Sequence, residues 1–340
     1  MINAAIIGLG RWGQNLVNSV QGKSDAIRFV VGMVRDPAKA QAYAREKGFP
    51  LHDSYEKVLA DPGVDAVVLA TPHTRHAEQI VAAAKARKHV FTEKPLALAA
   101  KDARSALRAC AKAGVTLGVG YNWRFQPALQ QIRRMLEDGR LGKLLHVEGN
   151  FCGPSAYRFP KGHWRQEREE GAAGGGMTGR GVHVVDAFLY LAGRVESVHA
   201  QSARRVHDYG IDDTTSMLLR FSSGASGYLG TVIATAETWR MQVFGSKGWV
   251  EVGDVEHLTT WEMKTCFVDP QNLLVHHKPQ VTRFDTVSTE RSELENFARA
   301  AAARRPLAVA GGDEEHGVAV FEAVLKSAKT RKTIRVFGKA

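Results

Sequence analysis

Three glycines near the start of the chain have the spacing of a phosphate-binding turn. Gly8, Gly10 and Gly13 follow the apolar run at residues 4–7, where a buried strand should turn into a helix. The first glycine permits a tight turn, the second lets the backbone approach a pyrophosphate, and the third lets the helix pack closely on the strand. The helix N-terminus offers N–H groups to the phosphates. The pattern predicts a dinucleotide site; the alternative is a glycine-rich turn without a ligand.

A lysine is the second residue that could do chemistry. Lys94 stands in Glu93-Lys94-Pro95, between an apolar run at 89–92 and a helical stretch that begins at 100. Such a loop lies at the carboxyl edge of a parallel sheet, where ligands bind. A lysine near cations or in a dry pocket has a lowered pKa and can exchange a proton with a substrate. The alternative is a surface lysine ahead of a proline that starts a helix.

The end of the expected second strand discriminates between two cofactors. NAD-selective sites place Asp or Glu about 20 residues past the glycines, where the carboxylate binds the ribose 2′-hydroxyl. This chain has Val34 there and Arg35 next, and a guanidinium can pair with a 2′-phosphate through two hydrogen bonds. The sequence therefore favours NADP over NAD. Asp36 is the competing ribose ligand, although Asp36-Pro37 is typical of an N-cap followed by a first-turn proline.

The pattern of apolar residues divides the chain at about residue 120. Before it, apolar runs alternate with helical stretches, which indicates a parallel sheet with helices on both faces. The expected strands are 4–7, 29–34, 66–70, 89–92 and 116–119, and the expected helices are 12–20, 38–47, 76–86 and 100–113. We therefore predict a dinucleotide-binding domain at 1–120.

After residue 120, consecutive strands joined by short turns indicate an antiparallel sheet. The expected strands are 144–151, 196–203, 214–221, 227–235, 240–244, 248–252 and 333–337, and the expected helices are 127–137, 182–191, 292–303 and 314–327. The glycine-rich stretch 171–181 is expected to be a flexible loop close to backbone or ligand. We predict a substrate-binding and oligomerisation domain at 121–340, whose last helix or strand packs back on the first domain.

The composition, 44% hydrophobic and 24% charged over 340 residues, is ordinary for a soluble globular protein. We expect neither a membrane segment nor a signal peptide, because no apolar run is long enough and none follows a basic segment at the start. Cys110, Cys152 and Cys266 are dispersed. They predict neither a disulfide framework nor a structural zinc site, and a reducing cytoplasm is the simplest location.

The net charge of +11 does not by itself predict a nucleic-acid partner. The basic residues are scattered, and short groups such as Arg204-Arg205 and Arg304-Arg305 lack interleaved aromatics. The charge is better suited to attracting anionic small molecules, namely a phosphorylated cofactor and an acidic substrate. The alternative is that the excess charge only aids solubility.

A series of motifs in a fixed order runs along nearly the whole chain. After the glycine turn come TPHTRH at 71–76, EKP at 93–95, GYNWRFQP at 120–127, GRLG at 139–142, GVHVVD at 181–186 and FGSKG at 244–248. With these motifs the chain resembles the Gfo/Idh/MocA family of glucose–fructose oxidoreductase and inositol dehydrogenase. The resemblance implies an α/β protein, with a Rossmann domain of doubly wound parallel sheet and a second α/β domain with a large open, mostly antiparallel sheet. It also implies hydride transfer between a nicotinamide and a secondary alcohol or carbonyl of a sugar, cyclitol or dihydrodiol-like compound.

The resemblance also implies roles for individual residues. It places Lys94 beside the substrate hydroxyl and the nicotinamide, next to a cis peptide bond before Pro95, and it places His183 in the active site; a core histidine is the alternative for His183. With the arguments above, the expected cofactor-binding residues are Gly8, Gly10, Arg11, Trp12, Gly13, Arg35, Thr71, Pro72, His73, His76, Glu93 and Lys94. The expected substrate-binding residues are Lys94, Asn122, Arg124, Trp164, Arg165, Thr178, Arg180 and His183.

The reasons for Trp164, Arg165, Asp186 and the absence of an expected metal are as follows. Arg165 could hold a carboxylate or phosphate while Trp164 stacks on a ring, or both could belong to a structural loop. Asp186 is expected to orient its helix or the His183 imidazole. One His and one Asp at this spacing make no closed metal site, so no metal is expected.

One position departs from the family pattern. Many members carry Asp four residues before the histidine, where it assists the catalytic pair, and this chain has Gly179. Arg180, Thr178 or Lys94 alone would then supply what the aspartate supplies elsewhere. The alternative function is a catalytically weak dinucleotide-binding sensor or assembly protein of the same fold.

Family members commonly associate through the open face of the second sheet. We therefore expect a homodimer or homotetramer, with Val243 and Val250 as candidates to line that face. The other expected partner is a small-molecule substrate.

Overall fold

The computed structural model describes residues 1–158, 162–167, 170, 172–206, 210–258, 261–274, 277–305 and 313–336. The chain divides into two compact units. The first comprises Met1–Asn122 and Ser288–Glu315, and the second comprises Trp123–Val287 and the C-terminal part from His316. The first long segment thus ends two residues beyond the expected boundary at 120, and a later segment, 288–315, also belongs to the first unit.

The first unit is built on a parallel sheet with strand order β3-β2-β1-β4-β5-β6. Its strands are β1 (Ile2–Ile7), β2 (Ile27–Met33), β3 (Leu51–His52), β4 (Ala66–Leu69), β5 (His89–Thr92) and β6 (Leu117–Val119). Its helices are α1 (Arg11–Val20), η1 (Pro37–Lys39), α2 (Gln41–Glu46), α3 (Tyr55–Ala60), η2 (His73–Arg75), α4 (His76–Lys85), α5 (Ala100–Ala113) and α9 (Thr289–Ala302). The strand order reverses between β1 and β4, and in such sheets ligands bind outside the carboxyl ends of the strands at this point.

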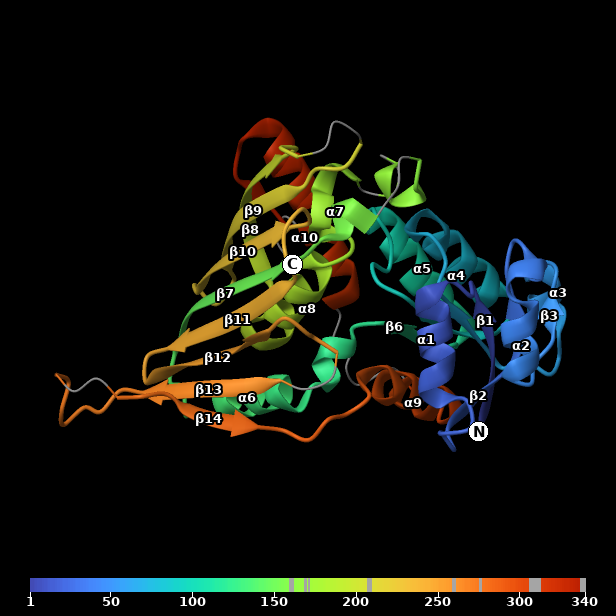
Figure 1. Cartoon of the computed structure of the whole chain (residues 1–340), viewed down its shortest axis with the longest axis horizontal. Helices are drawn as coiled ribbons and strands as arrows, with labels where there is room; N and C mark the ends of the chain where they lie inside the picture. The colour runs from blue at the N-terminus through green and yellow to red at the C-terminus, as the bar shows by residue number, and fades with distance from the viewer. Residues whose placement is uncertain are drawn as a thin grey trace. The chain divides into compact units, whose positions relative to one another are not determined.

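Both faces of this sheet are covered, as the apolar strands predicted. All four residues of β4 are buried, and alternate strand residues such as Ala66 and Val68 join one apolar cluster with α1 and α9. Phe297 of α9 lies in that cluster beside Phe91 of β5, with ring centroids 5.7 Å apart. Figure 1 shows α1 and α9 together at this sheet. Helix α9 therefore belongs to the first unit although it follows the second unit's strands in sequence.

The second unit is built on a sheet with strand order β14-β13-β12-β11-β7-β10-β9-β8-β15 (Figure 1). Its neighbouring strands are antiparallel, except β7 and β10, which are parallel. The strands are β7 (Leu144–Cys152), β8 (Val195–Ala203), β9 (Thr214–Phe221), β10 (Ser226–Val232), β11 (Thr238–Gly245), β12 (Gly248–Asp254), β13 (Glu262–Phe267), β14 (Gln280–Arg283) and β15 (Ile334–Arg335). The helices are η3 (Asn122–Phe125, which starts in the first unit), α6 (Pro127–Glu137), α7 (Ser155–Arg158), η4 (Trp164–Gln166), η6 (Ala172–Met177), α8 (Gly181–Ala192) and α10 (Asp313–Thr330).

Helix α8 covers one face of the second sheet and comes close to β7 at a glycine. A Cβ atom on Gly149 of β7 would lie within 3.0 Å of the Phe188 ring and would overlap Val184. The glycine therefore sets the close packing of α8, and with it the position of His183 in the first turn of that helix.

Several local expectations are corrected by the structure. The expected helix at 38–47 is divided into η1 and α2, and β10 ends at Val232 rather than 235. The glycine-rich stretch expected to be a flexible loop contains the short helix η6, and a Cβ on Gly175 (φ +55°) would overlap the carbonyl of Asp212, so the expected close backbone approach is confirmed. Gly171 of that stretch and Phe337 of the expected last strand lie outside the described residues.

The expectation that Val243 and Val250 line the open face of the sheet is wrong. Both are fully buried, because they pair in register with each other and with Val147 and so point to the covered face. The opposite face instead carries Leu218 and Tyr228, which are paired across β9 and β10 and are 60% and 39% exposed.

In the part of the chain that the structure describes, no helix combines the length and the apolar character needed to cross a membrane.

Candidate active site

The three glycines of the first turn have three different surroundings. Gly8 has φ +95°, and a Cβ there would lie 2.6 Å from the carbonyl oxygen of Ala70 at the end of β4. A Cβ on Gly13 would overlap the carbonyl oxygen of Gly8. Gly10, the N-cap of α1, has no atom within 4 Å of a Cβ position. Main-chain atoms therefore leave no room for a side chain at Gly8, in the turn, or at Gly13, where the helix packs. Gly10, at which a phosphate is expected, is open.

The residues beside this turn differ in exposure. Arg11 is exposed at the start of α1, and Trp12 is half-buried against the apolar cluster of the first unit. Arg35 is exposed beyond β2 and makes no ion pair within the described residues. Asp36 stands at the N-cap position of η1 without a side-chain capping bond and pairs with Lys39 at 3.2 Å. The guanidinium of Arg35 is thus accessible to a ligand at the end of the second strand.

His76 connects the loops that follow β4 and β5. Its ring is completely buried, with Nδ1 2.8 Å from the carbonyl oxygen of Pro95 and Nε2 3.0 Å from that of Thr71. Carbonyl oxygens only accept, so both contacts are hydrogen bonds only when both ring nitrogens carry a proton. Thr71 is held further by its hydroxyl, which donates to Gln79 at 2.6 Å. His76, expected to bind the cofactor, is therefore placed to position the loop that carries Lys94.

The neighbouring residues that were expected to bind the cofactor lie at the same carboxyl edge of the parallel sheet. His73 is buried in η2, with its ring edge-on to His76 at 6.0 Å, and Pro72 is the N-cap of η2. The peptide bond between Lys94 and Pro95 is cis, as the resemblance implies.

Glu93 is a buried carboxyl directly before Lys94. Burial raises the pKa of Glu93 to about 7, although the charge of Lys94 and the indole of Trp12 oppose this shift. Any side chain at residue 120 would press on this carboxyl, because a Cβ on Gly120 would lie 2.9 Å from Glu93 Oε1. The glycine of the GYNWRFQP motif thus makes room for Glu93.

In the second unit, His183 lies in the first turn of α8 and is 4% exposed. The indole of Trp123 stacks on its imidazole, with centroids 5.4 Å apart and planes inclined by 22°. The ring of Phe151 on β7 lies at 6.1 Å. Tight aromatic packing therefore fixes the orientation of this imidazole.

Asp186, expected to orient its helix or the His183 imidazole, pairs with an arginine of another element. Its carboxylate receives hydrogen bonds from Arg124 Nε at 2.9 and 3.0 Å and from Nη2 at 2.6 Å, and both side chains are only 4% exposed. Arg124 also lies over the ring of Tyr190, at 5.3 Å. The partner that the structure gives Arg124 is therefore an internal carboxylate rather than a substrate, and this ion pair joins η3 to α8.

Asn122, another expected substrate ligand, is also buried. It is 1% exposed, and its Nδ2 donates to the hydroxyl of Thr289 at 3.2 Å in the first unit. This contact ties the end of the first long segment to the start of α9.

The surroundings of Gly179 differ in charge from the family pattern. A Cβ on Gly179 would have one neighbour within 4 Å, Nη1 of Arg165 at 3.7 Å. The Arg165 guanidinium in turn lies over the ring of Trp164 at 4.5 Å. A cation therefore lies beside the position at which many family members carry a carboxylate.

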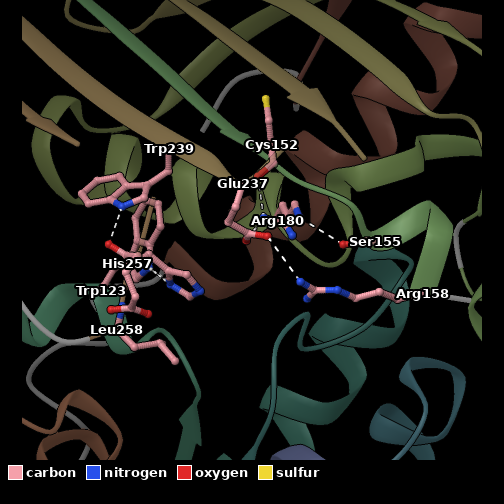
Figure 2. A network of polar contacts seen from close by, with 10 residues as sticks. Trp123, Cys152, Ser155, Arg158, Arg180, Glu237, Trp239, His257 and Leu258 are labelled. Carbon is pink, nitrogen blue, oxygen red and sulfur yellow. Dashed lines mark hydrogen bonds and ion pairs between the residues drawn. The ribbon is translucent and has the colours of Figure 1, made fainter. Parts of the chain in front are cut away.

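Arg180, the next residue, is bound by groups of its own unit (Figure 2). It donates to Glu237 at 2.8 Å, to the carbonyl of Cys152 at 2.7 Å and to the hydroxyl of Ser155 at 3.1 Å. Arg180 therefore holds α8 to the segment after β7, and the neighbouring Thr178 is buried.

The sequence analysis did not identify Glu237 or His257. Glu237 binds Arg180 from a position 57 residues away, and the His257 ring centroid lies 6.0 Å from that of His183. Neither residue belongs to a motif, so no local signal could have found them. No group of three metal-ligating side chains occurs among the residues that were searched, namely those described.

Comparison with known proteins identifies both parts of the chain. Residues 2–121 match the oxidoreductase family with an NAD-binding Rossmann fold, and residues 129–251 match the GFO/IDH/MocA C-terminal domain. The scyllo-inositol 2-dehydrogenase (NAD(+)) of Bacillus subtilis is 31% identical over 75% of each chain. The D-xylose 1-dehydrogenase (NADP(+)) 2 of Haloferax volcanii is 29% identical over 89% of this chain and 90% of that one.

A solved structure supports the fold over the whole length. The aldose-aldose oxidoreductase from Caulobacter crescentus superposes with a TM-score of 0.85 at 24% identity, over 98% of this chain and 99% of that one. The nicotinamide-dinucleotide domain and the named relatives make the protein an NAD(P)-dependent oxidoreductase of CH–OH groups. The chain belongs to the Gfo/Idh/MocA family.

Proposed function

We propose that the protein is an NADP-dependent oxidoreductase that transfers a hydride between the nicotinamide and a secondary alcohol or carbonyl carbon of an acidic sugar or cyclitol. The observation that carries the substrate class is the Arg165 guanidinium beside Gly179. A guanidinium pairs with a carboxylate through two parallel hydrogen bonds, so an acid group on the substrate would take the position at which many family members carry an aspartate. The stacked ring of Trp164 would hold that guanidinium flat.

Residues of each unit would contribute to this reaction. The bound dinucleotide supplies the hydride acceptor or donor. Lys94 Nζ exchanges the proton of the reacting hydroxyl, and the His76 contacts to Thr71 and Pro95 hold its loop in place. His183 would bind the substrate, and Trp123 fixes the orientation of its ring. The open main chain at Gly10 and the N-terminus of α1 would bind the pyrophosphate, Gly8 and Gly13 allow that turn, and Arg35 would bind the 2′-phosphate.

The named relatives suggest which substrates to test. The two curated relatives above are named for D-xylose and scyllo-inositol, which are neutral polyhydroxy compounds. We propose that this chain acts on polyhydroxy compounds of similar size that also carry a carboxylate. D-Glucuronate against D-xylose is a convenient pair of probes.

The test compares acid and neutral substrates in the wild type and in Arg165→Gln. The nicotinamide absorbance reports turnover, and we expect kcat/KM of the wild type to favour the acid by roughly tenfold or more, as a charge-assisted hydrogen bond gives. Arg165→Gln should abolish the preference. Arg220→Gln, which removes a 71% exposed arginine of β9, is the matched control and should leave it unchanged. A wild type with a higher kcat/KM for D-xylose than for D-glucuronate would refute the acidic substrate class.

The alternative remains a dinucleotide-binding sensor or assembly protein without turnover. The observation that motivates this alternative is Gly179, which stands where many family members carry an aspartate. Binding of NADPH with no oxidation by any carbonyl in a broad panel would favour it.

We also propose a homodimer or homotetramer in a reducing, cytoplasmic environment. Leu218 and Tyr228 on the open face of the sheet are candidates for the interface, and all three cysteines are free thiols. Light scattering at micromolar concentration tests the assembly, and a monomer would contradict it.

A further inference from the structure

Arg180 occupies the N-cap of α8, a position for which arginine is a poor choice. N-caps are usually Ser, Thr, Asp or Asn, whose side-chain oxygen accepts a hydrogen bond from the first turn, and Arg180 makes no such bond. The helix dipole is positive at this end, and the first turn of α8 contains no acidic residue that would offset the cation. A residue that breaks two local rules indicates that its side chain serves another purpose.

The side chain of Arg180 leaves the helix and binds other segments of the second unit (Figure 2). It is only 9% exposed, and its donors reach Glu237 Oε1 at 2.8 Å, the carbonyl of Cys152 at 2.7 Å and the hydroxyl of Ser155 at 3.1 Å. Of these three partners only Glu237 carries a charge. A buried guanidinium without a counter-charge is costly, so Glu237, which lies between β10 and β11, is the partner that stabilises this arrangement.

A second arginine approaches Glu237 but contributes less. Nη2 of Arg158 lies 3.9 Å from Glu237 Oε2, and the Arg158 side chain is 60% exposed. Such an ion pair is screened by water and adds little stability. Gly153, in contrast, leaves room for the buried pair, because a Cβ there would overlap Nη2 of Arg180 and would lie 2.6 Å from Glu237 Oε2. The main partner of Glu237 is therefore Arg180.

The Arg180–Glu237 pair is connected to His183 in two ways. Through the main chain, the N–H of His183 donates to the carbonyl of Arg180 at 3.1 Å, so the position of Arg180 sets the first turn of α8. Through side chains, the Arg180 guanidinium lies over the ring of Phe151 at 4.6 Å, and that ring lies 6.1 Å from the imidazole of His183. A displaced Arg180 would therefore disturb both the backbone and the packing of His183.

We propose that Glu237 is a positioning residue of the active site, which holds Arg180 and through it fixes the His183 imidazole in the orientation that binds the substrate. This inference rests on the proposed function, since that function assigns His183 to the substrate. Glu237 takes no part in the hydride step. The carboxylate that supports the first turn of α8 thus comes from a distant segment, 57 residues after Arg180.

Two variants of Glu237 test the hydrogen bond to Arg180. Glu237→Ala removes the acceptor, whereas Glu237→Gln keeps a carbonyl oxygen that can accept from Arg180 Nη1. We expect kcat/KM for the best substrate of a D-xylose, scyllo-inositol and D-glucuronate panel to fall about tenfold in Glu237→Ala, as loss of one charge-assisted hydrogen bond gives, and to stay within about threefold of wild type in Glu237→Gln. An equal loss in both variants would overturn the role of this hydrogen bond.

The matched control is Glu148→Ala. The Glu148 side chain is 32% exposed, as is that of Glu237, and it accepts from Arg240 Nη2 at 2.9 Å in the same unit. It lies on the open face of the sheet, because its neighbour Val147 points to the covered face. This variant should leave kcat/KM unchanged.

A double variant tests whether Glu237 acts through Arg180. In an Arg180→Met background the partner of Glu237 is already lost, so Glu237→Ala should cause no further fall in kcat/KM. Two residues that act independently would instead give losses that multiply, and this result would overturn the proposal.

A further readout does not depend on turnover. The His183 imidazole stacks on the indole of Trp123, with planes inclined by 22°, so the chemical shifts of its ring protons depend on its orientation. In the full chain labelled with ¹³C,¹⁵N-histidine, the His183 resonance is identified by its loss in His183→Asn. We expect it to move in Glu237→Ala and to stay in place in Glu237→Gln and Glu148→Ala. Urea denaturation checks that each variant is folded, and Glu237→Asp, whose carboxylate is one methylene shorter, replaces Glu237→Ala if that variant does not fold.

The outcomes distinguish the inference from the proposed function. A His183 resonance that moves in Glu237→Ala, in a protein that turns over none of the three compounds, would support the positioning role and count against hydride transfer. Turnover with unchanged kcat/KM and an unmoved resonance in Glu237→Ala would overturn the role of Glu237 and leave the proposed function intact. A fall in kcat/KM without movement of the resonance would also overturn it, because Glu237 would then not act through His183.

Discussion

The two units build their functional groups in different ways. In the first, the edge is made by main-chain atoms and by residues close in sequence: Gly8 and Gly13 are confined by carbonyl oxygens, and His76 binds the carbonyls of Thr71 and Pro95. In the second, side chains hold one another across long separations: Arg124 and Asp186 are 62 residues apart, and Trp123 and His257 are 134 apart. A dinucleotide is shared by many enzymes and is bound through backbone geometry, whereas a substrate is selected by side chains. Substitutions should therefore affect the two units differently.

The largest expected effect is on the reaction itself, at the first unit. Lys94→Ala should lower kcat by about 10²–10⁴, because it removes the group that exchanges the hydroxyl proton. Binding of NADP should change little, since the glycine turn and Arg35 are untouched. Steady-state kinetics and fluorescence titration of the cofactor measure the two quantities. Lys101→Ala, an exposed lysine of α5, is the control. Turnover within a few-fold of wild type in Lys94→Ala would remove this lysine from the mechanism.

The next effect is on stability, at the second unit. Asp186→Ala leaves the buried Arg124 guanidinium without its carboxylate and should lower the free energy of unfolding by about 3–5 kcal/mol. Replacing both partners, as in Arg124→Met with Asp186→Leu, should cost much less, because no buried charge is left unpaired. Urea denaturation measures both. Equal losses in the single and the double variant would show that the pair does not hold this unit together.

The third prediction concerns pH and the first unit. The pKa of Glu93 is raised by burial from 4.5 to about 7 in the folded chain. Between these values the folded state keeps a proton that the unfolded state loses, so this contribution to stability is complete below pH 4.5 and is lost as pH rises through 7. The loss should be about 3 kcal/mol. In Glu93→Gln this part of the pH dependence should be absent, whereas it should persist in Glu46→Gln, which changes a 67% exposed carboxyl. Identical pH profiles in wild type and Glu93→Gln would contradict the raised pKa.

The smallest expected effect is on cofactor choice. Arg35→Asp removes a cation that can form two hydrogen bonds with the 2′-phosphate and should weaken NADP binding by roughly ten- to a hundredfold. Binding of NAD should be affected much less, and high salt should reduce the difference. Dissociation constants at one ionic strength measure it, with Asp36→Asn as the control. If the wild type already prefers NAD, Asp36 becomes the better ribose ligand.

The difference between the units also explains what the sequence could predict. The strands of the first unit, apart from β3, are mostly apolar, and their predicted limits agree with the structure to within two residues. Strand β3 has only two residues, and all four residues of β14 are exposed, so neither carries an apolar pattern. Asp186 was expected to orient its helix or the His183 imidazole, but its pairing with Arg124 on another element was not predicted. A single sequence does not reveal such pairs.

The same limit applies to the region around His183. The glycine at 179 was visible in the sequence, but the guanidinium beside it belongs to Arg165, on a different segment. Val243 and Val250 were assigned to the open face, although strand alternation directs them with Val147 to the covered one. Alternation alone gives two faces and does not say which of them a helix covers.

The central claim is that the protein transfers a hydride to or from an acidic polyhydroxy compound. The most direct measurement uses NADPH deuterated at nicotinamide C4, with the carbonyl form of a sugar acid, and locates the deuterium by mass spectrometry. The account predicts deuterium on the carbon of the new alcohol in the wild type, and strongly reduced transfer in Lys94→Ala. A wild type that binds both compounds and transfers no deuterium to carbon would contradict it.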